Sequence, residues 1–177
     1  MNITVFCSAN ELDERYTAPA REFARLLGEH GHTLVWGGSN AGLMGQIADE
    51  ARAAGARLVG VSVELLNHRA YQGADELITT IDLATRKAEL LLRADAVVVL
   101  VGGLGTLDEA TEVIELKKHK QHTKPVVFLD TDGFYDGLRI QLRRMEQEGF
   151  LPVELDSLVR FAADGAQALA YLEGTED

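Results

Sequence analysis

The sequence predicts an α/β protein with a Rossmann-like fold, in which helices flank both faces of a doubly wound parallel sheet. Three observations support this prediction. Segments typical of strands alternate with segments typical of helices along the whole chain. Residues 96–101 are uniformly apolar, as expected for a strand buried on both faces. The 177 residues suffice for one domain with a sizeable core, so we expect a single domain over residues 1–177.

Six segments are expected to be strands, because each is a short run of mainly apolar residues. They span residues 3–7, 33–36, 57–63, 95–101, 125–129 and 158–162. A further extended piece over residues 76–81 is expected at an edge of the sheet. Right-handed crossovers leave few topologies for such strands. With the edge piece left uncounted, the doubly wound strand order 3-2-1-4-5 fits best.

Helices are expected between these strands, and glycines mark two of their ends. Phe23, Leu26 and Leu27 mark the first helix, which ends at Gly31 because glycine readily adopts the left-handed conformation that ends helices. The second helix ends at Gly55 for the same reason. The helices after the first are expected over residues 43–54, through residue 93, and over residues 106–119, 134–148 and 164–172.

The winding direction of this sheet reverses between the first strand and the strand over residues 95–101. Ligands of doubly wound sheets bind outside the carboxyl ends of the strands at such a point. Ser8 and the loop after Val101 are therefore expected to face one crevice. There Ser8 either contacts phosphate or ribose, or simply caps the strand end.

The chain is strongly acidic, with 28 Asp and Glu residues against 17 Lys and Arg residues and a formal net charge of −11. This charge repels nucleic acid and anionic membranes, so neither is an expected partner. It also repels a phosphate monoester. Any phosphate site must therefore be a local arrangement of backbone N–H groups and one or two cations.

The expected location is the cytoplasm. The chain opens on a strand-like segment without the features of a signal peptide. Its longest strongly apolar run, residues 96–101, is far too short to cross a bilayer. Cys7 is the only cysteine, so no intrachain disulfide can form, and a reducing compartment is expected.

The first candidate binding motif follows the buried strand and opens a helix. Gly102, Gly103 and Gly105 allow a ligand to approach the backbone, and the helix N-terminus offers free N–H groups and a positive dipole end. Thr106 either caps the helix or donates its hydroxyl to a phosphate oxygen. The motif is neither a Walker A loop nor a complete dinucleotide fingerprint. Its alternative is a tight strand-to-helix turn.

A second glycine cluster over residues 37–45 also follows a strand and precedes a helix. We expect Gly37, Gly38 and Met44 to contribute to the substrate pocket, either with N–H donors or by shaping the space for the base. The alternative is close packing of helix against sheet, which glycines also permit.

Three charged residues are candidates for the chemistry. Glu109 either matches the helix dipole or faces a sugar, where a carboxylate stabilises the positive charge of an oxocarbenium-like transition state. Arg86 offers a planar fork for phosphate and Lys87 a flexible point charge. A solvated basic pair is the alternative for these two residues.

We expect no metal and no cofactor. His119 and His122 are three residues apart, but no carboxylate or cysteine pattern completes a metal site with them. Cys7 has no histidine base nearby in the sequence and is expected to be a small buried hydrophobe. Lysine decarboxylation would require pyridoxal phosphate on Lys87, and the flanking loops suit a nucleotide better.

The two glycine motifs resemble those of the Lonely Guy family of cytokinin riboside 5′-monophosphate phosphoribohydrolases, whose bacterial members were often labelled possible lysine decarboxylases. That family pairs Gly-Gly-x-x-x-Gly-Leu-Met-Gly with Pro-Gly-Gly-x-Gly-Thr-x-x-Glu, which stand here at residues 37–45 and 101–109, with Val101 in place of the proline. The similarity also includes residues 5–8, 124–126 and 132–135.

The resemblance implies a homodimer that releases a free base and ribose 5-phosphate from a nucleotide. It further implies that Arg86 and Glu109 are essential for catalysis and that residues 102–106 hold the phosphate. The chain departs from the family pattern at residues 60–63, 83–85 and 116–118. These departures surround base and sugar recognition, so the preferred base, purine or cytokinin-type, stays open.

Two functions therefore remain open from the sequence. The first is a nucleoside 5′-monophosphate phosphoribohydrolase, which the retention of Arg86 and Glu109 favours. The second is a non-catalytic nucleotide- or cofactor-binding sensor or carrier of the same fold, which the altered residues 83–85 and 116–118 favour.

Overall fold

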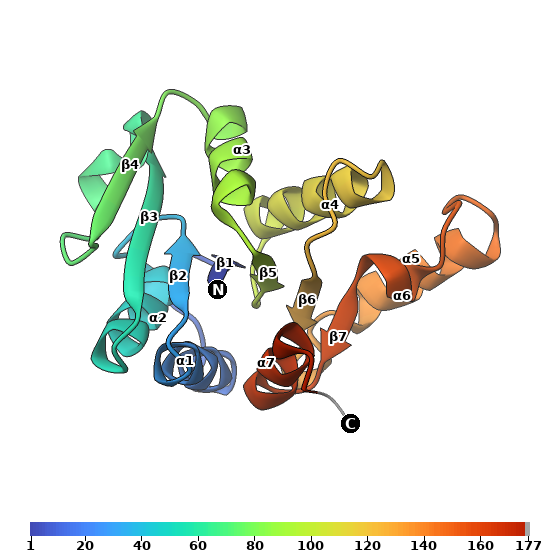
Figure 1. Ribbon diagram of the computed structural model, residues 1–177, viewed down its shortest axis with the longest axis horizontal. Coiled ribbons are helices and arrows are strands. Elements are labelled where there is room, and N and C mark those ends of the chain that lie inside the picture. Colours follow the sequence, from blue (N-terminus) through green and yellow to red (C-terminus); the bar gives the residue numbers. More distant parts are fainter. Residues whose placement is uncertain (176–177) are drawn as a thin grey trace.

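The computed structural model describes residues 1–175, which form a seven-stranded sheet with helices on both faces (Figure 1). Residues 176 and 177 of the expected domain lie outside this description. The strand order is β4-β3-β2-β1-β5-β6-β7, and every pairing is parallel. The strands are β1 (Asn2–Phe6), β2 (Thr33–Trp36), β3 (Arg57–Val63), β4 (Glu76–Thr80), β5 (Ala96–Val99), β6 (Val126–Leu129) and β7 (Arg160–Ala162). The predicted doubly wound order is confirmed, with the reversal between β1 and β5.

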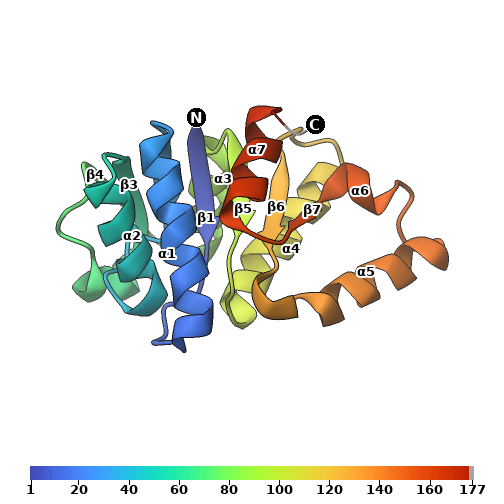
Figure 2. The same cartoon turned by 90° about the horizontal axis from the view of Figure 1, so that it is seen from below.

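The helices divide between the two faces of the sheet (Figures 1 and 2). One face is covered by α1 (Glu14–Glu29), α2 (Gly42–Ala53) and α7 (Gly165–Glu173). The other is covered by α3 (Leu83–Arg93), α4 (Leu104–Lys118), α5 (Asp136–Gln147) and α6 (Leu155–Leu158). Two short 3₁₀ segments, η1 (Glu64–Arg69) and η2 (Thr131–Gly133), complete the connections.

The core consists of two apolar layers that share the sheet. In β5, Val98 packs into one layer while Val97 and Val99 pack into the other, as the period of two in a strand requires. All three valines are fully buried, which explains why this segment lacks polar alternation.

Local sequence signals account for several helix boundaries. Asp13, Asp82 and Asp164 each accept a hydrogen bond from a backbone N–H in the first turn of α1, α3 and α7. Gly31 and Gly55 follow the ends of α1 and α2 with positive φ angles of 71° and 91°, as predicted.

Several predicted boundaries are wrong by two residues or more: the strand expected to reach residue 101 ends at Val99, and the helix expected to begin at residue 134 begins at Asp136. The helix expected to begin at Thr106 begins two residues earlier, at Leu104, with Gly103 as its N-cap. The strand expected over residues 158–162 is limited to Arg160–Ala162, because Leu155 and Leu158, three residues apart, bury on one side of the short helix α6.

Within residues 1–175, none of the helices is both long enough and apolar enough to span a membrane.

Candidate functional site

A cavity of about 340 Å³ opens at the carboxyl ends of β1 and β5, where the winding of the sheet reverses. Ser8 follows β1 and donates its backbone N–H to the carbonyl of Val101 at 3.1 Å, so the loops after both strands meet there. Most of the predicted site residues line this cavity, namely Ser8, Gly37, Met44, Arg86, Gly103, Gly105, Thr106 and Glu109. The structure thus places both glycine motifs in one site, as expected for the switch point.

The first glycine turn leaves open space in front of the N-terminus of α4. A Cβ atom on Gly103 or Gly105 would meet no protein atom within 4 Å. A Cβ on Gly102, in contrast, would lie 2.0 Å from Oγ1 of Thr106, so this glycine allows the turn itself to form. Since Gly103 is the N-cap, Thr106 does not cap the helix. Its buried side chain remains a candidate ligand for a phosphate that binds the helix N-terminus.

Arg86 and Glu109 form a buried ion pair at the bottom of this cavity. Nη1 of Arg86 donates to Oε1 of Glu109 at 2.6 Å, and Nε donates to the carbonyl of Val61 at 2.9 Å. Only 10% and 9% of the two side chains are exposed. Such charge-assisted hydrogen bonds fix both groups in position. The two residues that the sequence proposed for the chemistry are therefore in direct contact.

Gly37 provides the space that Arg86 occupies. A Cβ at this position would lie 2.2 Å from Nη2 of Arg86 and 3.1 Å from the end of the Met44 side chain. The second glycine motif therefore positions the arginine of the ion pair. Gly38 has a different role, because its backbone packs against β3. A Cβ at this position would lie 3.2 Å from the backbone nitrogen of Val61, and its φ of 68° also favours glycine. This residue lies outside the cavity lining.

The charges of the site interact strongly because they are buried. Burial raises the pKa of the Glu109 carboxyl above its ordinary value, and the neighbouring Arg86 charge opposes that rise. Burial, followed by the Glu109 charge, also raises the pKa of the Cys7 thiol. The thiol in the cavity wall therefore stays protonated near neutral pH and is a poor nucleophile.

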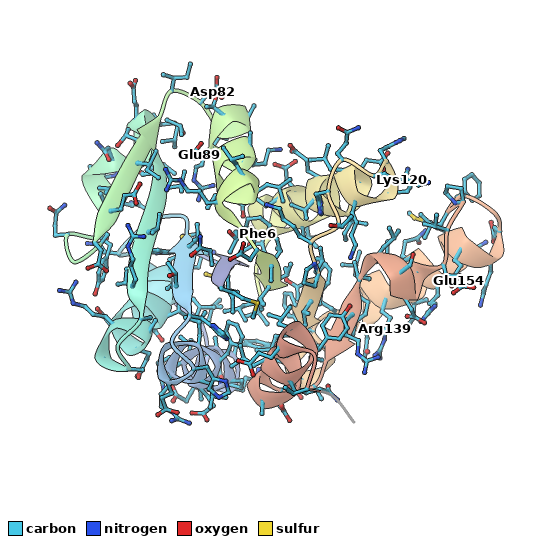
Figure 3. All side chains as sticks on the ribbon, viewed as in Figure 1. Phe6, Asp82, Glu89, Lys120, Arg139 and Glu154 are labelled. Atoms are coloured by element: carbon cyan, nitrogen blue, oxygen red, sulfur yellow. The ribbon has the colours of Figure 1, made fainter. Side chains whose placement is uncertain are left out.

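Lys87 lies away from this cavity. Its Nζ contacts Asp108 at 2.9 Å and also pairs with Glu112 on α4. These contacts, Glu112 first, raise the pKa of Lys87. Lys87 instead lines a second cavity of about 300 Å³ between α3 and α4, which Phe6 reaches from the end of β1 (Figure 3). A role of Lys87 in substrate binding remains a prediction.

Sequence reasoning missed the contribution of η1. Leu66 and Arg69 line the first cavity, and Arg69 adds a second arginine to it. Backbone hydrogen bonds between this segment and the second glycine motif hold it there: the N–H of Asn40 donates to Arg69 and the N–H of Tyr71 to Gly38, both at 2.8 Å. One sequence feature could have pointed to Arg69: it is a basic residue that follows the carboxyl end of β3, the edge of the sheet at which ligands bind.

Ser62 and Val63, at the end of β3, also line the first cavity. They belong to the residues 60–63 at which the sequence departs from the family pattern. In contrast, Leu116 lines the second cavity. Of the residues that depart from the family pattern, only some therefore line the cavity that contains the Arg86–Glu109 pair.

The doubly wound sheet, the glycine turn before α4 and the buried Arg–Glu pair define a Rossmann-like protein with a ligand site at the switch point of its sheet. The family model described as "Possible lysine decarboxylase" matches residues 44–172. A cytokinin riboside 5′-monophosphate phosphoribohydrolase of Mycobacterium tuberculosis is 38% identical over 160 residues, covering 89% of this chain and 86% of the relative. One of Arabidopsis thaliana is 36% identical, covering 97% and 82%. The chain belongs to this family, the Lonely Guy phosphoribohydrolases, as its motifs predicted.

Solved structures with the same fold include proteins of another description. The molybdenum cofactor binding protein of Rippkaea orientalis superposes with a TM-score of 0.77 at 21% identity, covering 98% of this chain and 95% of that one. The Moco carrier protein of Chlamydomonas reinhardtii superposes with a TM-score of 0.71 at 26% identity, covering 98% and 96%. The Rossmann-like fold is thus shared beyond the phosphoribohydrolases.

Proposed function

We propose that this protein hydrolyses the N-glycosidic bond of a nucleoside 5′-monophosphate with a purine or cytokinin-type base, releasing the free base and ribose 5-phosphate. The observation that carries the proposal is the buried Arg86–Glu109 pair in the same cavity as the open N-terminus of α4. A phosphate at that N-terminus would bring the sugar of a nucleotide to the carboxylate. The names of the relatives support the same reaction.

In this proposal the reaction divides between two parts of the cavity. The N–H groups after Gly103, the hydroxyl of Thr106 and the positive end of the α4 dipole bind the phosphate. The Glu109 carboxylate faces the ribose and stabilises the positive charge that develops at its anomeric carbon. The bond from that carbon to the base nitrogen breaks, and its electron pair leaves with the base. Water adds to the carbon, and the proton that it gives up passes to the departing base. Arg86 holds Glu109 in place and favours its ionised form.

The ion pairs of Lys87 argue against lysine decarboxylation, despite the family description. A lysine that forms a Schiff base must lose its proton to become a nucleophile. Asp108 and Glu112 instead raise the pKa of Lys87, which keeps the amine protonated, and its side chain faces the second cavity.

A cofactor carrier without catalytic activity is the second candidate. The likeness to the Moco carrier protein of Chlamydomonas reinhardtii favours it. The more similar phosphoribohydrolases and the presence of both charged partners at the site favour hydrolysis.

Turnover of two nucleotides tests the proposal directly. The purified protein is incubated with AMP and with isopentenyladenosine monophosphate, and the products are separated chromatographically. We expect free base and ribose 5-phosphate from at least one of them, and about a hundredfold less product, or less still, from the Glu109→Gln variant prepared in parallel. Tight binding of both nucleotides with no base released would favour the carrier.

Calorimetry with AMP and adenosine tests the phosphate site separately. AMP should bind more tightly by roughly 2–3 kcal/mol, the scale of a charge-assisted hydrogen-bonded contact. Equal affinities would contradict the assignment of the phosphate to the N-terminus of α4.

A further inference from the structure

A second cluster of polar side chains lies at the end of the sheet opposite the nucleotide cavity. Nδ1 of His30 and Nε2 of His32 are each 2.8 Å from Oε1 of Glu173, and the three ligand atoms lie within 4.8 Å of one another. His30 and His32 connect α1 to the start of β2, while Glu173 is the last residue of α7. Figure 2 shows the N-terminus, the end of α1 and α7 along the same upper edge of the molecule.

The backbone holds the two imidazoles on the same side of the turn. Gly31, with its positive φ, reverses the chain between the histidines. The N–H groups of His30 and His32 donate to Leu26 and Leu27 at 3.0 Å, which fixes both residues to the last turn of α1. The second ring nitrogen of His32 lies 3.3 Å from the nitrogen of Met1, which keeps Nε2 directed at Glu173. The two rings are therefore placed before any ligand arrives.

The third ligand is held by the packing of α7 on α1. A Cβ on Gly165 would lie 3.0 Å from the Cα of Phe23, so the two helices approach closely. Leu169 is buried in the same core layer as Leu27. A carboxylate distant in the sequence thus reaches two histidines through rigid elements. The side chains of His32 and Glu173 are 9% and 24% exposed, and that of His30 is 43% exposed, so one side of the cluster is open.

Two helix ends and a carboxylate at this place favour a cation, although the N-terminal ammonium of Met1 beside His32 opposes it. The C-terminal ends of α1 and α7 meet here, and each contributes the negative end of its helix dipole. The carboxylate of Glu173 adds a full negative charge, and the whole chain carries −11.

We propose that His30, His32 and Glu173 bind a divalent transition-metal ion, with Zn²⁺ as the best match. Two imidazole nitrogens and one carboxylate oxygen form a donor set that zinc accepts, with water as the fourth ligand. Mg²⁺ and Ca²⁺ prefer oxygen ligands and should not compete. The site is independent of the proposed hydrolysis, because it lies at the amino ends of the strands. It differs from His119 and His122, the pair that the sequence analysis set aside; these contact Glu115 and the carbonyl of Val113 separately.

Metal binding requires the three side chains to rearrange. Around tetrahedral Zn²⁺, with ligand bonds of about 2.0–2.1 Å, neighbouring ligand atoms are roughly 3.3 Å apart. The carboxylate of Glu173 must therefore withdraw by about half an ångström from each imidazole. The two ring nitrogens, which the 4.8 Å limit allows to lie farther apart than this, must also approach each other, and the exposed side chain of His30 is the one free to move. The proton that His30 shares with Glu173 moves to its other ring nitrogen. Nε2 of His32 releases its proton to solvent, while the N-terminal ammonium of Met1 passes one of its protons to Nδ1 of His32.

Calorimetric titration of the metal-free, untagged full chain with ZnCl₂ tests this proposal. We expect one Zn²⁺ per chain and no binding of MgCl₂. His30→Gln and Glu173→Gln should each weaken Zn²⁺ binding at least tenfold, since even the loss of an outer-shell partner has an effect of about this size. His119→Gln is the matched control, because His119 also contacts a glutamate but has no third ligand. It should bind Zn²⁺ like the unmodified chain.

Thermal unfolding with and without one equivalent of Zn²⁺ separates a metal site from a purely structural contact. Zinc should raise the unfolding temperature of the unmodified chain and of His119→Gln, because it joins the α1–β2 turn to α7. It should leave His30→Gln and Glu173→Gln unchanged. The proposal is overturned if the unmodified chain takes up no Zn²⁺, if both cluster variants bind it undiminished, or if His119→Gln loses as much affinity as they do. Should Glu173→Gln fold poorly, His30→Gln decides, since that side chain is the most exposed of the three.

Discussion

Arg86 and Lys87 are neighbours in the sequence, yet their side chains reach different cavities. Successive residues of an α-helix project about 100° apart, so only one of the pair can face the first cavity. Arg86 does so because Gly37 leaves room for its guanidinium, while Lys87 points at the acidic side of α4. A basic pair in a motif therefore contributes one cation to the site and one to the contact between two helices.

The negative charge of Glu109 can be removed with little change in shape. Glu109→Gln is nearly isosteric, so the fold and most of the AMP affinity should be kept. Turnover should fall by about a hundredfold or more, the scale of one electrostatic catalytic group. Steady-state kinetics should show kcat lost while KM holds or drops. Glu115→Gln, the same change at an exposed position of α4, is the control; wild-type turnover in Glu109→Gln would assign the carboxylate to the helix dipole alone.

The pH dependence of turnover tests the pairing of Arg86 with Glu109. If the ionised carboxylate is the active form, kcat rises with pH through the pKa of Glu109 and is lost below it. Burial raises that pKa and the Arg86 charge lowers it. Arg86→Gln should therefore reduce turnover and move the acid limb of the kcat profile to higher pH. Arg93→Gln on the same helix should not move it. If the acid limb of the kcat profile stayed at the same pH in Arg86→Gln, a group other than Glu109 would control it.

At the scale of elements, hydrophobic pattern and turn chemistry were sufficient to predict the strand order and most helices. The 3₁₀ segment η1 was not predictable in this way, because its six residues are exposed and carry no apolar period. The placement of Arg69 in the cavity therefore escaped the sequence. The ion pair between Arg86 and Glu109 escaped it as well, since its partners lie on different helices and only the packing of α3 beside α4 brings them together.

The glycine turn before α4 provides a test in which stability and binding should separate. Gly105→Ala adds a methyl group where no protein atom lies within 4 Å, and alanine favours a helix over glycine by about 0.5–1 kcal/mol. The unfolding temperature should therefore hold or rise. Calorimetry should nevertheless show AMP affinity reduced about tenfold or more, equivalent to about 1.4 kcal/mol, because the methyl group enters the space for the phosphate.

Two other glycines serve as controls for that variant. Gly137→Ala, equally open on α5, should leave AMP binding unchanged. Gly102→Ala should lower the unfolding temperature, because its Cβ would clash with Thr106. If Gly105→Ala bound AMP as tightly as the unmodified chain, the phosphate would have to bind elsewhere.

The apolar residues in the middle of α4 are mostly unavailable for a contact between two copies of the chain. Val113 and Ile114 are buried in the core of the chain itself, and Leu116 is half-buried. One exposed apolar surface lies over the second cavity between α3 and α4, where Leu92 is 75% exposed. An exposed leucine beside an apolar cavity is typical of an interface. We therefore place the proposed dimer contact on this surface.

Light scattering at micromolar concentration should give twice the 19.3 kDa mass of one chain. Leu92→Glu should shift the mass towards a single chain, because dimerisation would bury an unpaired carboxylate in an apolar contact. Ile140→Glu, on the exposed side of α5, should leave the dimer intact. If Ile140→Glu gave the single-chain mass while Leu92→Glu stayed dimeric, the interface would lie on α5 instead.

A single-chain mass for the unmodified protein would contradict any arrangement in which a partner completes the site. If the Leu92→Glu monomer still hydrolysed AMP normally, each chain would carry a complete site, and dimerisation would matter only for stability.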